Sequence, residues 1–185
     1  MGTAGRDLEP EGAIERRPAR VTPVTDASYP TWIAWGLIAA AVVVAGAWLL
    51  LAVAHVDDRF MVDHVSGVRI ALARYANDGT LYPELYRDGF YGGTRFMPLP
   101  IVVHAASARL TGEYLVAGKL LGYLTTAGVV AMTFLILRGR RCPFALNLAL
   151  SVLLLTTSAG LAASMNMRGD LLPLVLQLVA VWIVT

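Results

Sequence analysis

The sequence predicts an all-α, polytopic helical membrane protein with about four spans. Of its 185 residues, 57% are hydrophobic and 15% are charged, whereas a soluble domain carries about 25% charged residues. Several uncharged apolar runs approach or exceed the roughly 20 residues that an α-helix needs to cross a bilayer core. The basic residues near these runs stand in short clusters at their ends, as topology signals do. We therefore expect the lipid bilayer to be the main solvent of the chain.

Charge and cysteine content disfavour two classes of function. The formal net charge of +2 is too small to indicate a nucleic-acid partner. The single cysteine, Cys142, can form no internal disulfide and follows an arginine cluster rather than a set of metal ligands. We therefore expect neither nucleic-acid binding nor redox or metal–cysteine chemistry.

The first 31 residues are a predicted disordered tail. They hold charged residues among Pro, Gly and Thr, without any apolar period. The apolar run 32–54 that follows has 23 residues, which fits a span and exceeds the roughly 7–15 residues of a signal-peptide core. We expect this run to cross the membrane, with Trp32 and Trp35 at one interface.

Two further spans and an incomplete fourth follow in the second half of the chain. Residues 114–137 form the second predicted span, which ends at the arginine-rich segment 138–141. Residues 142–164 form the third, with Pro143 in the first turn, where the missing N–H costs nothing, and we expect a tight hairpin with the second span. Residues 171–185 are apolar but number only 15, fewer than the ~20 that cross a bilayer. We therefore expect this span to be incomplete, with C-terminal spans or a partner chain missing.

The arginine distribution predicts the orientation. Segment 138–141 holds three arginines, against only Arg168 in the turn 165–170. Because basic residues favour the cytoplasmic side, we expect the 138–141 turn and the N-terminal tail in the cytoplasm and the loop 56–113 outside. Six arginines in this 58-residue loop oppose the assignment, although the rule acts only in loops shorter than about 60 residues. The sequence thus predicts a multi-pass protein of the cell membrane with a cytoplasmic N-terminus.

The external loop contains two predicted helices that lie along the membrane. The first is amphipathic, and its apolar residues recur at helical spacing at Val65, Val68, Leu72 and Tyr75 before an Asn-Asp-Gly stop at 77–79. The second, 98–110, is apolar but has only 13 residues, so we expect it to be interfacial or re-entrant rather than spanning. Segment 81–98 between them is rich in aromatic residues, Gly and charge. Such a composition is typical of a binding loop on a rigid scaffold.

A series of motifs follows in a set order through this part of the chain. After an acidic residue in the first external loop come Ala76-Asn-Asp-Gly79-Thr-Leu-Tyr82-Pro, Arg95-Phe-Met-Pro98-Leu-Pro, Leu110-Thr-Gly-Glu113-Tyr-Leu-Val-Ala-Gly-Lys119 and Met167-Arg168-Gly-Asp170. In their order and spacing, residues 56–184 resemble the amino-terminal part of GT-C-type membrane glycosyltransferases. That class contains the protein O-mannosyltransferases and the lipid A aminoarabinose transferases. The resemblance implies transfer of a sugar from a polyprenyl-phosphate donor on the extracytoplasmic face.

The resemblance also implies that a carboxylate in the first loop is the catalytic base. Asp63 matches best by its position relative to Gly79, with Asp57 and Asp58 as alternatives. The family often has two adjacent acids at this place, whereas His64 follows Asp63 here. A base is what the chemistry requires, because the acceptor hydroxyl must lose a proton while the phosphate already leaves well.

The donor phosphate needs cations, and the sequence offers several near the predicted external face. These substrate-binding candidates are Arg95, Lys119 and Arg168, together with Asp170, which matches an acidic position of the family's second external loop, and Tyr82 in the aromatic segment. A divalent cation could serve the same purpose. No ligand spacing supports a metal site, since His64 and His104 are isolated.

Each candidate also has a structural reading. Asp63 stands where it could simply be the N-cap of the amphipathic helix. Asp170 would favour the dipole of any helix that it opens, and Lys119 can extend to the interface. A non-catalytic or truncated accessory subunit is therefore the main alternative to a transferase. A small transporter is the third, although no predicted span contains a central Asp, Glu or His.

Overall fold

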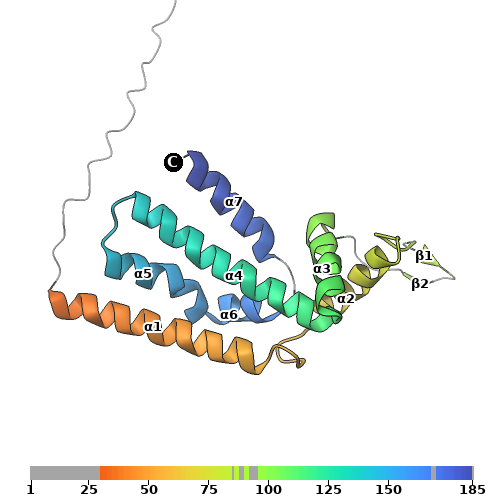
Figure 1. The fold of residues 1–185 in the computed structure, drawn as a ribbon, viewed down its shortest axis with the longest axis horizontal. Helices are drawn as coiled ribbons and strands as arrows, with labels where there is room; N and C mark the ends of the chain where they lie inside the picture. Colours follow the sequence, from red (N-terminus) through yellow and green to blue (C-terminus); the bar gives the residue numbers. More distant parts are fainter. Residues whose placement is uncertain (1–29, 85, 88–89, 92–95, 168–169, 185) are drawn as a thin grey trace, which may run out of the picture.

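The computed structural model describes residues 30–84, 86–87, 90–91, 96–167 and 170–184, and these are mainly helical (Figure 1). Two helices, α1 (Thr31–Ala54) and α4 (Tyr114–Gly139), are long and apolar enough to cross a membrane. A third crossing is possible if a bent helix pair counts as one span. The chain is therefore a helical membrane protein with two or three candidate spans. The predicted tail lies outside the described residues except for its last two positions.

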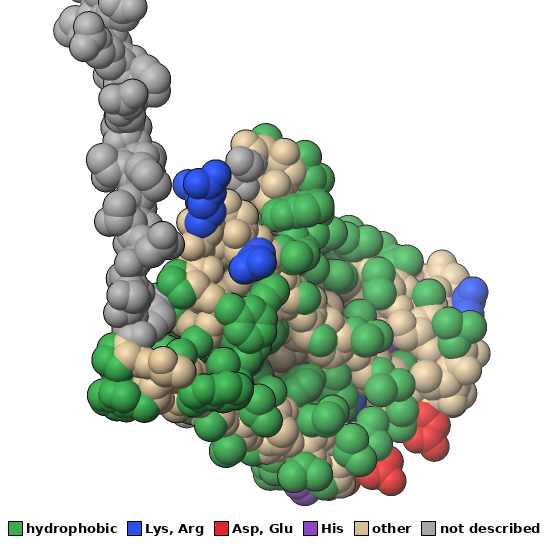
Figure 2. Space-filling model, turned by 60° about the vertical axis from the view of Figure 1, so that its left-hand side comes forward, with side chains coloured by type: hydrophobic (Ala, Val, Ile, Leu, Met, Phe, Trp, Pro, Cys, Tyr) green, Lys and Arg blue, Asp and Glu red, His purple; other side chains and the backbone are tan. Residues whose placement is uncertain are grey.

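Helix α4 is the central element of the bundle. It packs against α3 (Pro98–Thr111), α5 (Phe144–Val152), α6 (Ser158–Met165) and α7 (Leu171–Val184). Helix α1 packs against α5, and the core between them is built on Ala41, Val152 and Leu155. Hydrophobic side chains cover most of the face in Figure 2. An apolar outer surface is what a helix bundle presents to lipid.

The region predicted as the third span is bent. After α5 the chain forms a 3₁₀ turn, Leu153–Thr156, and then turns by 77° into α6. Thr157 stops the first segment and caps the second, because its Oγ1 accepts a hydrogen bond from the amide of Gly160 at 3.0 Å. The expected uninterrupted helix over 142–164 is therefore two helices. The run of three hydroxyl residues at 156–158 supplies the competing side-chain acceptors that permit the break.

The elements of the long loop gather beyond one end of the bundle. They are α2 (His64–Asn77), an antiparallel pair of two-residue strands, β1 (Tyr86–Arg87) and β2 (Phe90–Tyr91), and α3. Both predicted loop helices are confirmed as helices; the strand pair was not predicted. Helix α3 ends at Gly112, whose φ of 80° is the left-handed conformation that glycine adopts freely. In Figure 1 this group lies opposite the turn between α4 and α5.

Candidate functional site

Residues of two sequence motifs meet at Arg69 of α2. The Arg69 side chain is only 8% exposed, and its Nη2 lies 3.5 Å from Oδ1 of Asp170. Its Cζ also lies 5.1 Å from the ring centroid of Phe96. The structure thus brings together residues from α2, from the segment before α3 and from the start of α7. Arg95, which precedes Phe96, and Arg168, two positions before Asp170, lie outside the described residues.

We call the meeting of these residues around Arg69 the Arg69 junction. Helix α4 comes close to it at Gly118, next to Met167 and His104. A Cβ at this position would lie 2.6 Å from Sδ of Met167 and 2.9 Å from Nε2 of His104. His104 is buried, and its Nε2 lies 2.7 Å from the carbonyl oxygen of Tyr114. Since a carbonyl only accepts, Nε2 carries the proton. Burial lowers the pKa of His104, so this residue is a neutral donor.

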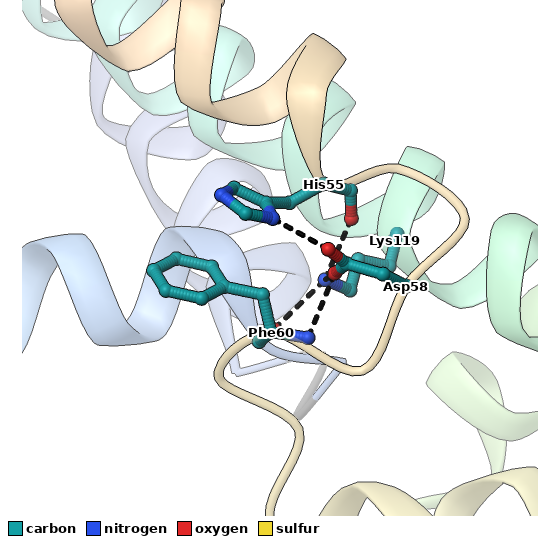
Figure 3. Close-up of polar contacts among 4 residues, drawn as sticks. All are labelled: His55, Asp58, Phe60 and Lys119. Atoms are coloured by element: carbon teal, nitrogen blue, oxygen red, sulfur yellow. Dashed lines mark hydrogen bonds and ion pairs between the residues drawn. The ribbon is translucent and has the colours of Figure 1, made fainter.

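Lys119 is fully buried and turned toward the loop that follows α1 (Figure 3). Its Nζ donates to the carbonyl oxygens of His55 and Phe60, each at 2.8 Å. It also lies 3.7 Å from Oδ1 of Asp58. The sequence analysis expected Lys119 to bind phosphate or to extend toward the interface. In the structure its ammonium group fastens the loop to α4, and its role in binding phosphate stays a prediction.

Asp58 is the second member of this cluster (Figure 3). Its Oδ2 lies 2.6 Å from Nδ1 of His55, and its Oδ1 accepts the amide of Phe60 at 2.8 Å. The hydrogen bond with His55 and then that from Phe60 lower the pKa of Asp58. The His55 ring also stacks on that of Phe60, with centroids 4.1 Å apart. The sequence analysis missed His55, although an His-x-x-Asp spacing at the end of a span was visible.

The predicted catalytic residue Asp63 is the N-cap of α2. Its Oδ1 accepts hydrogen bonds from the amide and the hydroxyl of Ser66, each at 2.9 Å. The structural reading of Asp63 is therefore confirmed, while its catalytic role stays a prediction. Asp57, the remaining alternative, is exposed. The three candidate bases thus differ: Asp63 caps a helix, Asp58 lies near the Lys119 ammonium group, and Asp57 is exposed.

Tyr82 lies at the same junction as Arg69. Its hydroxyl donates a hydrogen bond to the backbone carbonyl of Phe96. This bond ties the Asn-Asp-Gly turn region to the segment that begins α3. Among the predicted substrate-binding residues, Tyr82 and Asp170 are therefore linked through Phe96 and Arg69, whereas Lys119 belongs to the neighbouring cluster with Asp58.

Cavities also lie outside this junction, and two of them have volumes of about 520 Å³ or more. One of about 1100 Å³ lies against α2 and the start of α4, and it contains none of the predicted site residues. Its charged lining residues are Arg59, Arg74, Asp78 and Glu113. The other, of about 520 Å³, is an apolar groove between α1, α4 and α5. A groove of that lining suits a hydrocarbon chain rather than a polar reaction.

Within the described part of the chain, no group of three or more His, Cys, Asp or Glu side chains gathers that could hold a metal ion. Comparison with protein-family models, curated proteins and solved structures gives no match. The fold and the site geometry thus define a helical membrane protein with polar clusters at one end of its bundle.

Proposed function

We propose that this chain is the membrane portion of a GT-C-like glycosyltransferase that transfers a sugar from a polyprenyl-phosphate donor on the extracytoplasmic face of the cell membrane. The observation that supports this most is the meeting of distant motifs around Arg69. Asp170, Phe96 and Gly118 belong to three motifs of the resemblance, and all three contact Arg69 or its neighbour His104. Motifs that served only separate structural purposes would not need to converge.

The arrangement of the two bundle ends supports the proposed orientation. The start of α1 and the α4–α5 turn lie at the same end in Figure 1, and the loop elements lie at the other. Under the positive-inside rule the arginines of the α4–α5 turn face the cytoplasm. The junction around Arg69 then faces the side on which lipid-linked sugars are used. The N-terminus is cytoplasmic in this arrangement.

In the proposed reaction, Asp63 takes the proton of the acceptor hydroxyl. Asp58 is a poorer base because its lowered pKa weakens its hold on a proton, so we assign it to positioning the loop together with Lys119. Arg95 and Arg168 come one and two positions before Phe96 and Asp170, the residues that contact Arg69, and we assign both arginines to the donor phosphate. Tyr82 holds the Phe96 segment in place through its hydrogen bond, and Asp170 is the counterion of Arg69.

Replacing Asp63 by Asn tests the proposal, because Asn is an equally good N-cap but no base. Sugar transfer from a polyprenyl-phosphate donor should fall by about 10²–10⁴-fold in Asp63→Asn, with the melting temperature unchanged. The matched control is Asp57→Asn, an exposed carboxylate of the same loop, which should transfer normally. Normal transfer in Asp63→Asn with loss in Asp57→Asn or Asp58→Asn moves the base to that residue. Undiminished transfer in all three variants would show that no candidate carboxylate of this loop is the catalytic base.

A non-catalytic accessory subunit is the second candidate. The observation that favours it is the structural use of the loop residues: Asp63 caps α2, and Asp58 pairs with Lys119. The two candidates differ in turnover. Membranes that contain the wild-type protein alone should then transfer no sugar from any polyprenyl-phosphate donor. Transfer that appears only when a partner chain is added supports the accessory role.

A further inference from the structure

Arg69 is a buried cation with an unmatched donor. Among the described residues, its Nε is one of two buried side-chain polar atoms that have no hydrogen-bond partner; the other is the hydroxyl of Tyr123. Leaving such a donor unpaired in the interior costs free energy comparable to a lost hydrogen bond. A native protein places a group like this only where something compensates for it.

The helix period explains why Arg69 is enclosed. The buried residues of α2 are Ser66, Arg69, Leu72 and Ala73, which share one face of the helix. That face includes the contact with α3, since α2 and α3 pack together. An arginine at the centre of a packed face, rather than at the edge, cannot simply extend its head into water. Burial accordingly lowers the pKa of Arg69, although an arginine stays charged.

One edge of the Arg69 guanidinium is only half used. Nε and Nη2 point to the same side and form the edge that grips an oxyanion with two parallel bonds. Asp170 approaches this edge only at Nη2, and the 3.5 Å separation exceeds the roughly 2.7–2.9 Å of a charge-assisted hydrogen bond. The Asp170 side chain is 66% exposed. Among the described residues, this exposed and loosely held carboxylate is the acidic group paired with the edge.

The other neighbours orient Arg69 without neutralising it. Phe96 lies under the guanidinium at 5.1 Å and fixes its plane. His104 is neutral and already donates to Tyr114, so it supplies neither a negative charge nor a competing cation. A buried cation whose only described counterion is exposed favours any anion that fits its free edge.

We propose that the Nε–Nη2 edge of Arg69 binds the phosphate group of a membrane lipid and that Asp170 is the counterion which this phosphate displaces. Phosphate oxygens match the guanidinium fork side-on. The edge lies beside the start of α7, and α3 separates it from the first turns of α4. This is the end of the candidate spans at which we expect lipid headgroups. This inference deepens the proposed function, on which it rests, by adding Arg69 to the residues that hold the donor phosphate.

The test uses the purified full chain in a phosphate-free maltoside detergent. The probe is a long-chain polyprenyl monophosphate, its binding is measured by native mass spectrometry, and the alcohol of the same chain length is the blank. Arg69→Lys keeps the charge but loses the fork, so binding should weaken by about tenfold. Asp170→Asn removes the competing carboxylate and should tighten binding by about threefold, the size expected for an exposed charge pair. Arg138→Gln, at the opposite end of the bundle, should change nothing.

Wild-type affinity in both Arg69→Lys and Asp170→Asn, or equal binding of the alcohol, overturns the proposal. Weaker binding in Asp170→Asn overturns it as well, because that result makes Asp170 a ligand rather than a competitor. If Arg69→Lys fails to fold, the sign of the Asp170→Asn effect still decides. Competition by inorganic phosphate supports the oxyanion edge but assigns it to free phosphate instead of lipid. If lipid binding depends on Arg69 but the protein transfers no sugar, the phosphate site stands and the proposed glycosyltransferase function fails. If the protein transfers sugar but lipid binding does not depend on Arg69, the proposed function stands and the phosphate site fails.

Discussion

Lys119 reaches back from α4 to Asp58, and the two residues contribute unequally to the contact between them. The ammonium Nζ lies 3.7 Å from the Asp58 carboxylate but only 2.8 Å from two backbone carbonyls. The Lys119 side chain is fully buried, whereas that of Asp58 is 45% exposed. Water can therefore replace Lys119 as a partner of Asp58 more readily than it can replace Lys119 as the donor to the two part-buried carbonyls. We conclude that the lysine holds the loop and that the aspartate mainly balances its charge.

The first prediction concerns this asymmetry. Lys119→Met should lower the free energy of unfolding by about 1–3 kcal/mol, because it leaves two part-buried carbonyl groups without their ammonium donor. Asp58→Asn should cost much less, since exposed ion pairs contribute little. Thermal unfolding of both variants in detergent measures the difference. A larger loss in Asp58→Asn than in Lys119→Met would contradict the assignment.

The second prediction concerns acid. The pKa of Asp58 is lowered in the folded protein by the hydrogen bonds from His55 and Phe60. A group with a lowered folded pKa stabilises the protein above its unfolded pKa, about 3.9 for Asp. That contribution is lost as the pH falls from about 4 through the lower folded value. The melting temperature of Asp58→Asn should therefore match the wild-type value more closely at pH 3 than at pH 6. Equal differences at both pH values would show that Asp58 is not stabilised in the fold.

Much of the helical framework follows from local pattern. The two long apolar runs gave α1 and α4 to within two residues at either end, because helix length and hydropathy are properties of contiguous sequence. Amphipathic spacing likewise located α2. The bend after Thr156 was missed, because it depends on side-chain acceptors and a close backbone approach that hydropathy does not report.

The candidate site was predictable only in part. Asp63 as an N-cap was visible from its place before a helical pattern. Arg69 was not identified, because the burial of a cation depends on which elements pack over it. Here those elements are distant in the sequence: α3 packs against α2, and Asp170 approaches from the start of α7. Lys119 was assigned to phosphate from its place in the motif, and only the structure shows that two carbonyls take its donors.

The third prediction concerns the bend at α6. A methyl group at Gly160 would overlap the carbonyl oxygen of Leu154 and the hydroxyl of Thr157. Gly160→Ala should therefore destabilise the protein by about 1–3 kcal/mol, the usual cost of forcing atoms into a packed site. The control is Gly36→Ala in α1, where a Cβ meets nothing within 4 Å. That change should be neutral or stabilising by up to about 1 kcal/mol, since alanine favours helix. Equal melting temperatures for the two variants would exclude a tight bend.

The fourth prediction links packing to the Arg69 junction. Gly118→Ala places a methyl group 2.6 Å from Met167 Sδ and 2.9 Å from His104 Nε2, so both side chains must move. We expect a stability loss of about 1 kcal/mol or more and weaker binding of polyprenyl monophosphate, because His104 lies close enough to Arg69 to interact with it electrostatically and its displacement disturbs the Arg69 edge. Gly67→Ala on α2, where a Cβ meets nothing within 4 Å, is the control. Normal lipid binding in Gly118→Ala would show that the packing of α4 at Gly118 does not affect the phosphate site at Arg69.

The last prediction tests the orientation on which extracytoplasmic transfer depends. Thr80 follows α2 in the loop, Gly139 ends α4 at the arginine turn, and both residues are exposed. Single cysteines at these positions, in a Cys142→Ser background, report each end of the bundle separately. An impermeant thiol reagent applied to intact cells should label Thr80→Cys, whereas Gly139→Cys should react only after permeabilisation, because the arginines beside it retain that turn in the cytoplasm. The opposite pattern would put the Arg69 junction in the cytoplasm, where a donor used on the extracytoplasmic face could not reach it.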